Sequence, residues 1–194
     1  MPQVGIAQSP LLTVTLQSEI PRVRSTGLLS DGKFVGLMRS GFPLRLHYRL
    51  ELWKVRASWF DQYVREASWD AVARHDPLAD DFVLIRQGGS IRRYATPEEL
   101  AAALEIPYMV TLRPGGSGPG RYYFLARLEV TTLNDTDLQE LSRWLSGEVG
   151  PAVSGEGSLG EALARGAQRI IVRLAGLPRQ RLEARSATIR IDGR

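Results

Sequence analysis

The sequence predicts a mainly β fold of the α+β class: an antiparallel β-sandwich decorated with short helices and followed by a C-terminal amphipathic helix. Several segments alternate apolar and polar residues with a period of two, which is typical of strands that bury one face. Turn-forming residues separate these segments, and the helical patterns between them are short. A parallel βαβ fold would need a helix between successive strands, so roughly seven strands of an antiparallel sandwich are the better interpretation.

The composition fits one globular domain that folds without disulfide bonds. The chain has 194 residues, of which 43% are hydrophobic and 24% are charged, and this is enough to bury a core. It has no cysteine, which excludes thiol catalysis and cysteine-ligated zinc, and no run of about 20 apolar residues predicts a transmembrane helix. The formal net charge is +4 and the arginines are mostly scattered, so nucleic-acid binding is not expected. No cofactor is predicted.

The N-terminal half contains the clearest strand patterns. Leu11–Gln17 alternates as a half-buried strand. After a polar stretch, residues 30–41 begin with a capping residue and end at a glycine, which predicts a short helix. Every second residue of 43–55 is apolar, so this segment predicts a long strand with one buried face. Residues 59–73 predict its antiparallel partner, because aromatic and β-branched residues lie between charges.

A hairpin and a capped helix are predicted next. Residues 82–86 and 90–94 flank a turn with two glycines, which supply the positive φ angles of a tight connection. Residues 96–100, Thr-Pro-Glu-Glu-Leu, combine an N-cap residue, a proline at the first helical position and two acidic residues in the first turn. We therefore expect a helix that ends at about Leu104.

Two further strands, residues 108–112 and 121–132, are predicted to form a hairpin around the glycine-rich loop 113–120. The loop has no following Lys-Ser/Thr and leads into a strand, so it does not predict a phosphate-binding site. A short helix after these strands is expected to end at Gly147.

The chain is expected to comprise a β-sandwich domain at 1–147, a connector rich in Gly, Pro and Ser at 148–157, and a C-terminal part at 158–194 that packs on the same domain. This last part begins with an amphipathic helix and ends with a strand at 182–191. Three cations follow one another at helical spacing on the polar face of that helix: Arg165, Arg169 and Arg173. Either the helix packs on the sheet and its arginines are solvated, or it meets an anionic membrane surface or a partner subunit.

Several short motifs occur in the order typical of a known family. They are Gly41-Phe42-Pro43-Leu44-Arg45-Leu46, Leu50-Glu51-Leu52-Trp53, Trp59-Phe60-Asp61, Tyr94 with Thr96-Pro97-Glu98-Glu99-Leu100, Arg121-Tyr122-Tyr123 and Leu128-Glu129-Val130. Over about residues 10–147 the chain resembles domain-of-unknown-function family 4390. The resemblance implies an exported bacterial protein, of a kind often encoded near nitrogen-regulatory sensor kinases, with no assigned activity.

The resemblance places the expected location in the periplasm or at the cell envelope, but two features depart from the family pattern. The N-terminus lacks the basic region and long apolar stretch of a signal peptide, although Val4-Gly5-Ile6-Ala7 resembles the end of one. A start codon placed too far downstream would leave such a remnant, and an ordinary leader explains it equally well. The second departure is the additional segment 158–194.

One cluster combines an imidazole with carboxylates, as a metal site or a general base with its orienting partner would. It consists of His75, Asp76, Asp80 and Asp81. These residue types also favour turns, and their spacing is not that of a calcium-binding loop. The other histidine, His47, is predicted to be a lone surface residue between two arginines. The cluster therefore supports a secondary hypothesis, a metal-dependent enzyme or metal binder.

Trp53 and Tyr123 are difficult to place in the core, so we expect them, with nearby arginines, to form a surface that binds another protein. No catalytic residue is predicted. The sequence thus predicts a non-enzymatic interaction module or accessory subunit at the bacterial cell envelope, which binds a membrane-associated protein assembly or the membrane surface. An apolar cavity inside the sandwich would instead make the protein a binder of small apolar ligands, and this alternative stays open.

Overall fold

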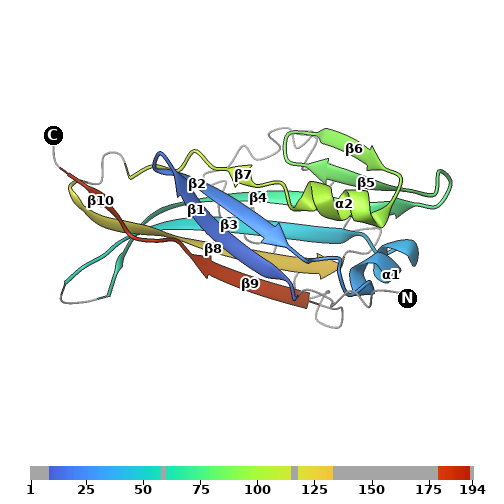
Figure 1. The fold of residues 1–194 in the computed structure, drawn as a ribbon, viewed down its shortest axis with the longest axis horizontal. Helices are drawn as coiled ribbons and strands as arrows, with labels where there is room; N and C mark the ends of the chain where they lie inside the picture. The colour runs from blue at the N-terminus through green and yellow to red at the C-terminus, as the bar shows by residue number, and fades with distance from the viewer. Residues whose placement is uncertain (1–8, 58–59, 115–117, 133–178, 193–194) are drawn as a thin grey trace, which may run out of the picture.

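The computed structural model describes residues 9–57, 60–114, 118–132 and 179–192, which form two antiparallel sheets and two short helices (Figure 1). The small sheet has the order β1-β2-β7 and contains β1 (Leu11–Gln17), β2 (Ile20–Thr26) and β7 (Tyr108–Met109). The large sheet has the order β10-β8-β3-β4-β5-β6, with β9 also paired to β8, and contains β3 (Leu44–Lys54), β4 (Gln62–Asp76), β5 (Asp81–Arg86), β6 (Ser90–Tyr94), β8 (Gly120–Thr132), β9 (Arg179–Arg185) and β10 (Ile189–Ile191). The helices are α1 (Lys33–Arg39) and α2 (Pro97–Leu104). The predicted mainly β, antiparallel fold with few short helices is confirmed.

Strand β3 lies in the middle of the large sheet and is paired over its whole length, with β4 on one side and β8 on the other. Its alternating sequence explains this position. The inward side chains are each at most 1% exposed: Leu44, Leu46, Tyr48, Leu50 and Leu52. The residues between them point to the opposite, polar face of the sheet, because side chains alternate along a strand. We call this polar side of the large sheet the outer face.

The inner face of the large sheet is covered by the small sheet and by both helices. Leu12 of β1, Val23 of β2, Met38 of α1 and Leu100 of α2 belong to the same core cluster as the inward side chains of β3. In Figure 1, β1 and β2 cross over the large sheet, and β1 lies beside β9. One continuous hydrophobic core therefore joins the layers, since neither sheet could bury its apolar face alone.

Strand β2 is absent from the sequence-based prediction, which treats the residues after Gln17 as a polar stretch. The prediction is wrong there because the turn between β1 and β2 has no glycine. Ser18 and Glu19 adopt positive φ angles of 49° and 65°. Asn-Gly or Gly-Gly at these two positions would have predicted a hairpin. A proline and two arginines further hide the alternation that buries Val23.

The predicted hairpin between residues 108–112 and 121–132 is also wrong. The first strand is reduced to the two residues of β7, which pairs with β2 in the small sheet. The second is β8, which pairs with β3 in the large sheet. The glycine-rich loop therefore connects the two sheets, and the alternation of apolar residues alone does not reveal which partner a strand chooses.

The predicted final strand at 182–191 is two strands, β9 and β10, separated at Ser186. The Ser186 hydroxyl accepts a hydrogen bond from the backbone N–H of Phe124 at 2.9 Å, and the backbone N–H of Ser186 donates to the Phe124 carbonyl at 2.9 Å. Residues 133–178 lie outside the described residues, and with them the predicted connector, the amphipathic helix and its three arginines, Arg165, Arg169 and Arg173. None of the described helices is long and apolar enough to cross a membrane.

The helix predicted to begin after Thr96 is confirmed as α2. The Glu99 backbone N–H donates to Thr96 Oγ1 at 3.2 Å, while the Ala95 backbone N–H donates to Glu99 Oε2 at 2.9 Å. These bonds resemble a capping box, except that the Glu99 side chain accepts from the residue before the N-cap. The strand predicted at 59–73 corresponds to β4, which begins and ends three residues later.

Truncation of the central strand should test the core. Leu46→Ala should lower the free energy of unfolding by about 2–5 kcal/mol, because Leu46 is fully buried and the substitution leaves a cavity. Leu78→Ala is the matched control: Leu78 is 98% exposed in the turn after β4, so its truncation should change stability by less than about 0.5 kcal/mol. Urea unfolding of both variants measures the difference, and equal effects would contradict the assigned core.

Candidate functional site

The structure brings His75, Asp76, Asp80 and Asp81 together around the turn between β4 and β5. His75 Nε2 lies 3.0 Å from Asp80 Oδ1. Arg93 of β6 donates to the other two carboxylates, to Asp76 Oδ2 at 3.0 Å and to Asp81 Oδ1 at 2.7 Å. Its hydrogen bond is the main cause that lowers the pKa of Asp76. Arg93 therefore compensates two of the three carboxylates that the sequence nominates, and no group of three metal-ligating side chains is found among the described residues.

Trp53 and Tyr123 lie side by side on the outer face, in a row with Tyr63 of β4. Trp53 Nε1 donates to a Glu51 carboxylate oxygen at 2.8 Å. Tyr123 is buried, and the Arg185 guanidinium lies 3.5 Å from its ring centroid. The two predicted partner-binding residues thus meet, but their polar atoms and ring faces are already engaged by the domain. Tyr63, at the end of the row, is 44% exposed and can still contact another molecule.

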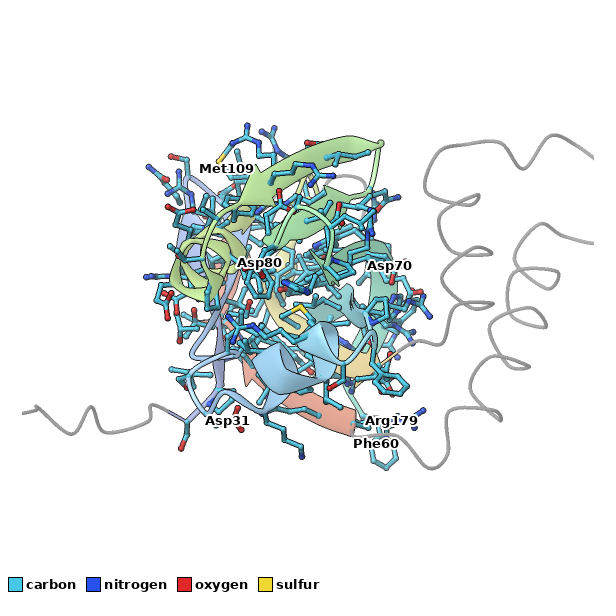
Figure 2. The ribbon with its side chains drawn as sticks, turned by 90° about the vertical axis from the view of Figure 1, so that its right-hand side faces the viewer. Asp31, Phe60, Asp70, Asp80, Met109 and Arg179 are labelled. Carbon is cyan, nitrogen blue, oxygen red and sulfur yellow. The ribbon has the colours of Figure 1, made fainter. Side chains whose placement is uncertain are left out.

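A buried carboxylate on the outer face corrects the prediction that His47 is a lone surface residue. His47 Nδ1 lies 3.0 Å from Asp70 Oδ1, and Arg45 Nε donates to the same oxygen at 2.8 Å. The Asp70 side chain is 3% exposed. Burial raises the pKa of Asp70, but hydrogen bonds from His47 and Arg45 outweigh burial, so the pKa lies below its ordinary value of 3.8. In Figure 2, Asp70 lies on the flank that the outer face forms.

A second buried carboxylate, Glu51, extends this network along the outer face. It accepts from Arg127 of β8 and from Trp53, and it lies 3.1 Å from Arg49 Nε. Arg127 Nε donates in turn to Glu183 of β9 at 2.8 Å. Cross-strand ion pairs therefore connect β9, β8 and β3, and they fix the register of the C-terminal strand.

Strand β4 is much longer than β5, the strand that flanks it on the side away from β3. β4 has 15 residues, whereas β5 has six and pairs only with residues 71–76 of β4. Among the strands that the structure describes, none pairs with residues 62–70 on that side, although the Asp70 carbonyl accepts from the backbone N–H of Gln87, just after β5. We call this unpaired side of residues 62–70 the open edge.

Two residues turn their backbone hydrogen-bonding groups toward the open edge. Residues of an antiparallel strand direct their N–H and C=O groups alternately to one neighbour and to the other. The Asp70 carbonyl accepts from the Gln87 backbone N–H at 3.2 Å, on the side of β5. Ser68 and Glu66, two and four residues earlier, therefore direct their backbone groups to the same side, beyond the end of β5. An edge of this kind is a template for another extended chain.

A groove of about 340 Å³ lies between the open edge and β7, where the two sheets meet without strand pairing. We call it the seam groove. The Tyr108 ring centroid lies 5.4 Å from that of Trp69 and 5.0 Å from that of Tyr48, and the Arg86 guanidinium lies 5.6 Å from the Tyr108 centroid. Met109, 68% exposed, forms part of the rim (Figure 2). The seam groove thus offers aromatic side walls next to unpaired backbone.

Two side chains that line the seam groove carry a buried polar atom without a hydrogen-bond partner among the described residues. These atoms are Trp69 Nε1 and Arg86 Nε. Burial is the main cause that raises the pKa of Tyr108, against the opposing effect of Arg86. A buried donor without an acceptor lowers stability, so the groove is locally suboptimal for the unbound domain, as binding sites often are.

The sequence does contain a signal for the open edge, although composition and motif searches miss it. A tight turn around Pro77 starts β5, and a two-glycine turn ends it after Arg86. A hairpin partner cannot pair beyond its own length, so a short β5 next to a long β4 leaves part of β4 uncovered. The sequence gives no sign that β7 leaves this part of β4 unpaired, because the position of β7 depends on tertiary contacts.

Asp70→Asn should destabilise the domain at neutral pH by about 1–3 kcal/mol, because Arg45 and His47 lose a charged acceptor. A carboxylate with a lowered folded pKa stabilises the fold above its unfolded pKa, and the contribution is lost as the pH falls through the folded pKa. The difference between wild type and variant should therefore shrink as the pH falls below 3.8, the ordinary pKa of Asp70. Urea unfolding across this range measures it.

Asp192→Asn serves as the control, since its side chain is 81% exposed. It should leave stability nearly unchanged at every pH. A pH-independent difference for Asp70→Asn would contradict the assigned role of the carboxylate.

Hydrogen exchange followed by NMR should distinguish the two sides of β4. The amide protons of Glu66 and Ser68 point to the open edge and should exchange rapidly, while those of Ala67 and Trp69 point to β3 and should be protected. Equal protection at all four positions would show that the edge is covered.

Comparison with known proteins agrees with the sequence motifs and adds no activity. A family model described as a domain of unknown function, DUF4390, matches residues 31–147, which is more than half of the chain. Neither the curated proteins nor the solved structures contain a match to this chain. The matched region includes α1, β3, β4, β5, β6, α2, β7 and β8, and hence the open edge, the seam groove and the buried carboxylates Glu51 and Asp70, but not β9. The chain belongs to the DUF4390 family.

Proposed function

We propose that this protein is a non-enzymatic interaction module of the bacterial cell envelope, an accessory subunit that binds an extended segment of another protein by strand addition to the open edge. The observation that carries the proposal is the unpaired side of residues 62–70, which directs the backbone groups of Glu66 and Ser68 outward. In strand addition, main-chain hydrogen bonds give affinity, and pockets beside the edge select side chains. The seam groove is such a pocket.

The chemistry of the open edge favours a bound strand over solvent. Natural proteins commonly protect an edge with proline, a short strand, a β-bulge or inward-pointing charge. Residues 62–70 contain no proline, and the register shift between Tyr63 and Arg65 leaves residues 65–70 as a regular stretch as long as the whole of β5. On one side of this edge lie the aromatic walls of the seam groove, and on the other lies the exposed Tyr63. An extended chain would therefore gain both ladder bonds and aromatic contacts.

The partner is a protein of the periplasmic or membrane-associated machinery, and this part of the proposal rests on what the family resemblance implies about export. Arg165, Arg169 and Arg173 lie outside the described residues. Their contribution to binding is tested separately, by substitution. A metal-dependent activity at His75 finds less support, because Arg93 compensates Asp76 and Asp81.

A pair of proline substitutions should test strand addition. Ser68→Pro removes an N–H that points to the open edge, where proline is tolerated, so the domain should stay folded and lose its partner. Ala67→Pro is the matched control one residue away: it removes an N–H that pairs with β3 and should lower the unfolding temperature. Circular dichroism measures folding, and pull-down of the tagged protein from membranes of its native host measures binding.

The outcomes are distinct. Loss of specific partners by folded Ser68→Pro supports strand addition. Unchanged capture by that variant contradicts it. Loss of capture only when Arg165, Arg169 and Arg173 are replaced by glutamate also contradicts it, since the partner would then be held by these arginines. Fractionation of the native host should place the protein in the periplasm or at the envelope, and a purely cytoplasmic protein would overturn that location.

A further inference from the structure

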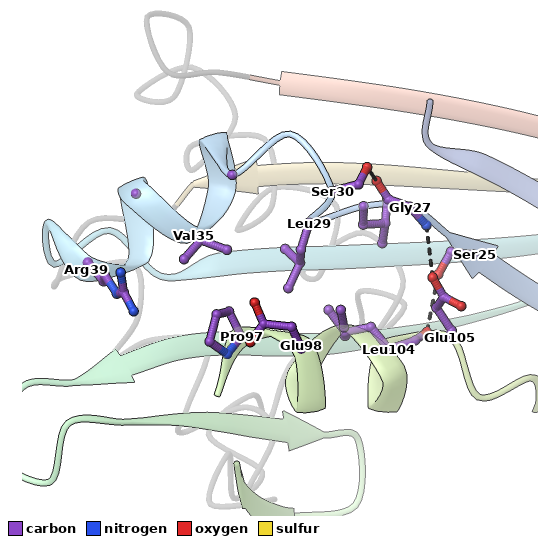
Figure 3. A pocket seen from close by; sticks show the side chains of 14 residues that line it. Ser25, Gly27, Leu29, Ser30, Val35, Arg39, Pro97, Glu98, Leu104 and Glu105 are labelled. Atoms are coloured by element: carbon purple, nitrogen blue, oxygen red, sulfur yellow. Dashed lines mark hydrogen bonds between the residues drawn. The ribbon is translucent and has the colours of Figure 1, made fainter. Parts of the chain in front are cut away.

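A second groove, of about 720 Å³, lies between α1 and α2 at one end of the sandwich (Figure 3). It is separate from the open edge and from the seam groove, with which it shares no lining residue. We call it the helix groove. Its volume lies within the range of about 300–1,000 Å³ that is typical of sites for small organic molecules.

The side walls of the helix groove are apolar. Val35 of α1 and Leu29 of the preceding loop lie on one wall, and Pro97, Ala101 and Leu104 of α2 lie on the other. On α2, Pro97, Ala101 and Leu104 recur at helical spacing, and α1 faces them with Val35 and Gly36, so both helices direct apolar or small residues into the groove. Two such stripes would normally pack against each other. Here they are separated by open space, which suits an apolar occupant.

Gly36 gives independent evidence that this space is maintained. It lies inside α1, where glycine is among the least favourable residues. Glycine in a helix is often explained by the close approach of another part of the chain, but a Cβ atom added at Gly36 would meet no other atom within 4 Å. Because Gly36 lines the helix groove, the missing side chain widens it without serving any internal contact among the described residues.

Most polar groups of the helix groove are already bonded within the domain. Ser25 Oγ lies 2.9 Å from the Tyr48 hydroxyl. Glu105 accepts from the Gly27 backbone N–H at 3.1 Å and pairs with Arg24 at 3.3 Å. These groups have little capacity to bind a charged ligand. The charges that remain at the groove are Arg39 and Glu98.

Arg39 lies at one end of the helix groove, opposite the end that Glu105 closes (Figure 3). The only contact recorded for its guanidinium among the described residues is with the Phe82 ring, whose centroid lies 5.8 Å away. A cation–π contact uses the charge of a guanidinium and forms no hydrogen bond with its N–H donors, whose planar fork matches a carboxylate. Glu98 lies in the first turn of α2, where the helix dipole already stabilises a negative charge.

We propose that the helix groove binds a small carboxylic acid with an apolar tail, with the carboxylate at Arg39 and the tail between α1 and α2. Apolar contact with Val35, Ala101 and Leu104 supplies affinity, and Arg39 selects an acid over an amine or alcohol with the same tail. This site is independent of the proposed strand addition, because it involves other residues at another part of the domain.

Three probes with one tail should test the charge preference: octanoate, octan-1-ol and octylamine, titrated into the full chain with NMR or calorimetric detection. Octanoate should bind at least tenfold more tightly than the other two. Arg39→Gln should remove this preference, whereas Glu98→Gln should keep it. Tightest binding of octylamine would overturn the proposal in favour of Glu98, and equal binding of all three would overturn the role of Arg39.

Gly36→Leu should test the location, because the added side chain projects into the helix groove and fills it. The variant should fold with an unchanged or raised unfolding temperature, since leucine favours a helix more than glycine does, and should no longer bind octanoate. Lys33→Leu is the matched control: it adds a leucine to the same helix at an exposed position that does not line the groove, and should bind normally. Unchanged binding by folded Gly36→Leu, or no binding of any probe to the wild type, would overturn the proposal.

Discussion

The pairing of β3 with β4 and β8 is the interaction on which the rest of the structure depends. β3 is hydrogen-bonded along both edges, and its five inward side chains are fully buried. These side chains fix which face of the large sheet becomes the core, because a shift of one residue in register would move all of them to the outer face. The small sheet and both helices then have one apolar surface on which to pack.

The same arrangement produces the two features that suit binding. β4 follows β3 along its full length, but β5 is too short to follow β4, so the open edge results from unequal strand lengths. The helix groove results from a similar mismatch, since α1 and α2 both pack on the core without filling the space between them. The open edge and both helices of the helix groove belong to the region that the family model matches.

The outer face shows how a solvent-facing sheet can hold buried charge. Asp70 and Glu51 are almost inaccessible, yet Asp70 is bonded to Arg45 and His47 of β3, and Glu51 accepts from Arg127 of β8 and from Trp53 of its own strand. A buried carboxylate without these donors would be strongly destabilising, and with them it specifies which strands lie next to each other. The network therefore favours this order of strands, and it supplies the partner of His47.

The sequence by itself determined the class of fold, the central strand, the β5–β6 hairpin and the capped helix α2, because alternation, glycine turns and capping residues are local signals. It also placed Trp53 and Tyr123 on a polar face, where they meet. Only the tertiary structure decided that β7 pairs with β2 instead of β8, and that Asp70 contacts Arg45 and His47. It also decided that residues 62–70 of β4 have no partner strand on the side of β5. Partner choice between strands depends on which apolar faces meet across the core and on the relative lengths of neighbours, and neither is encoded in any one segment of the chain.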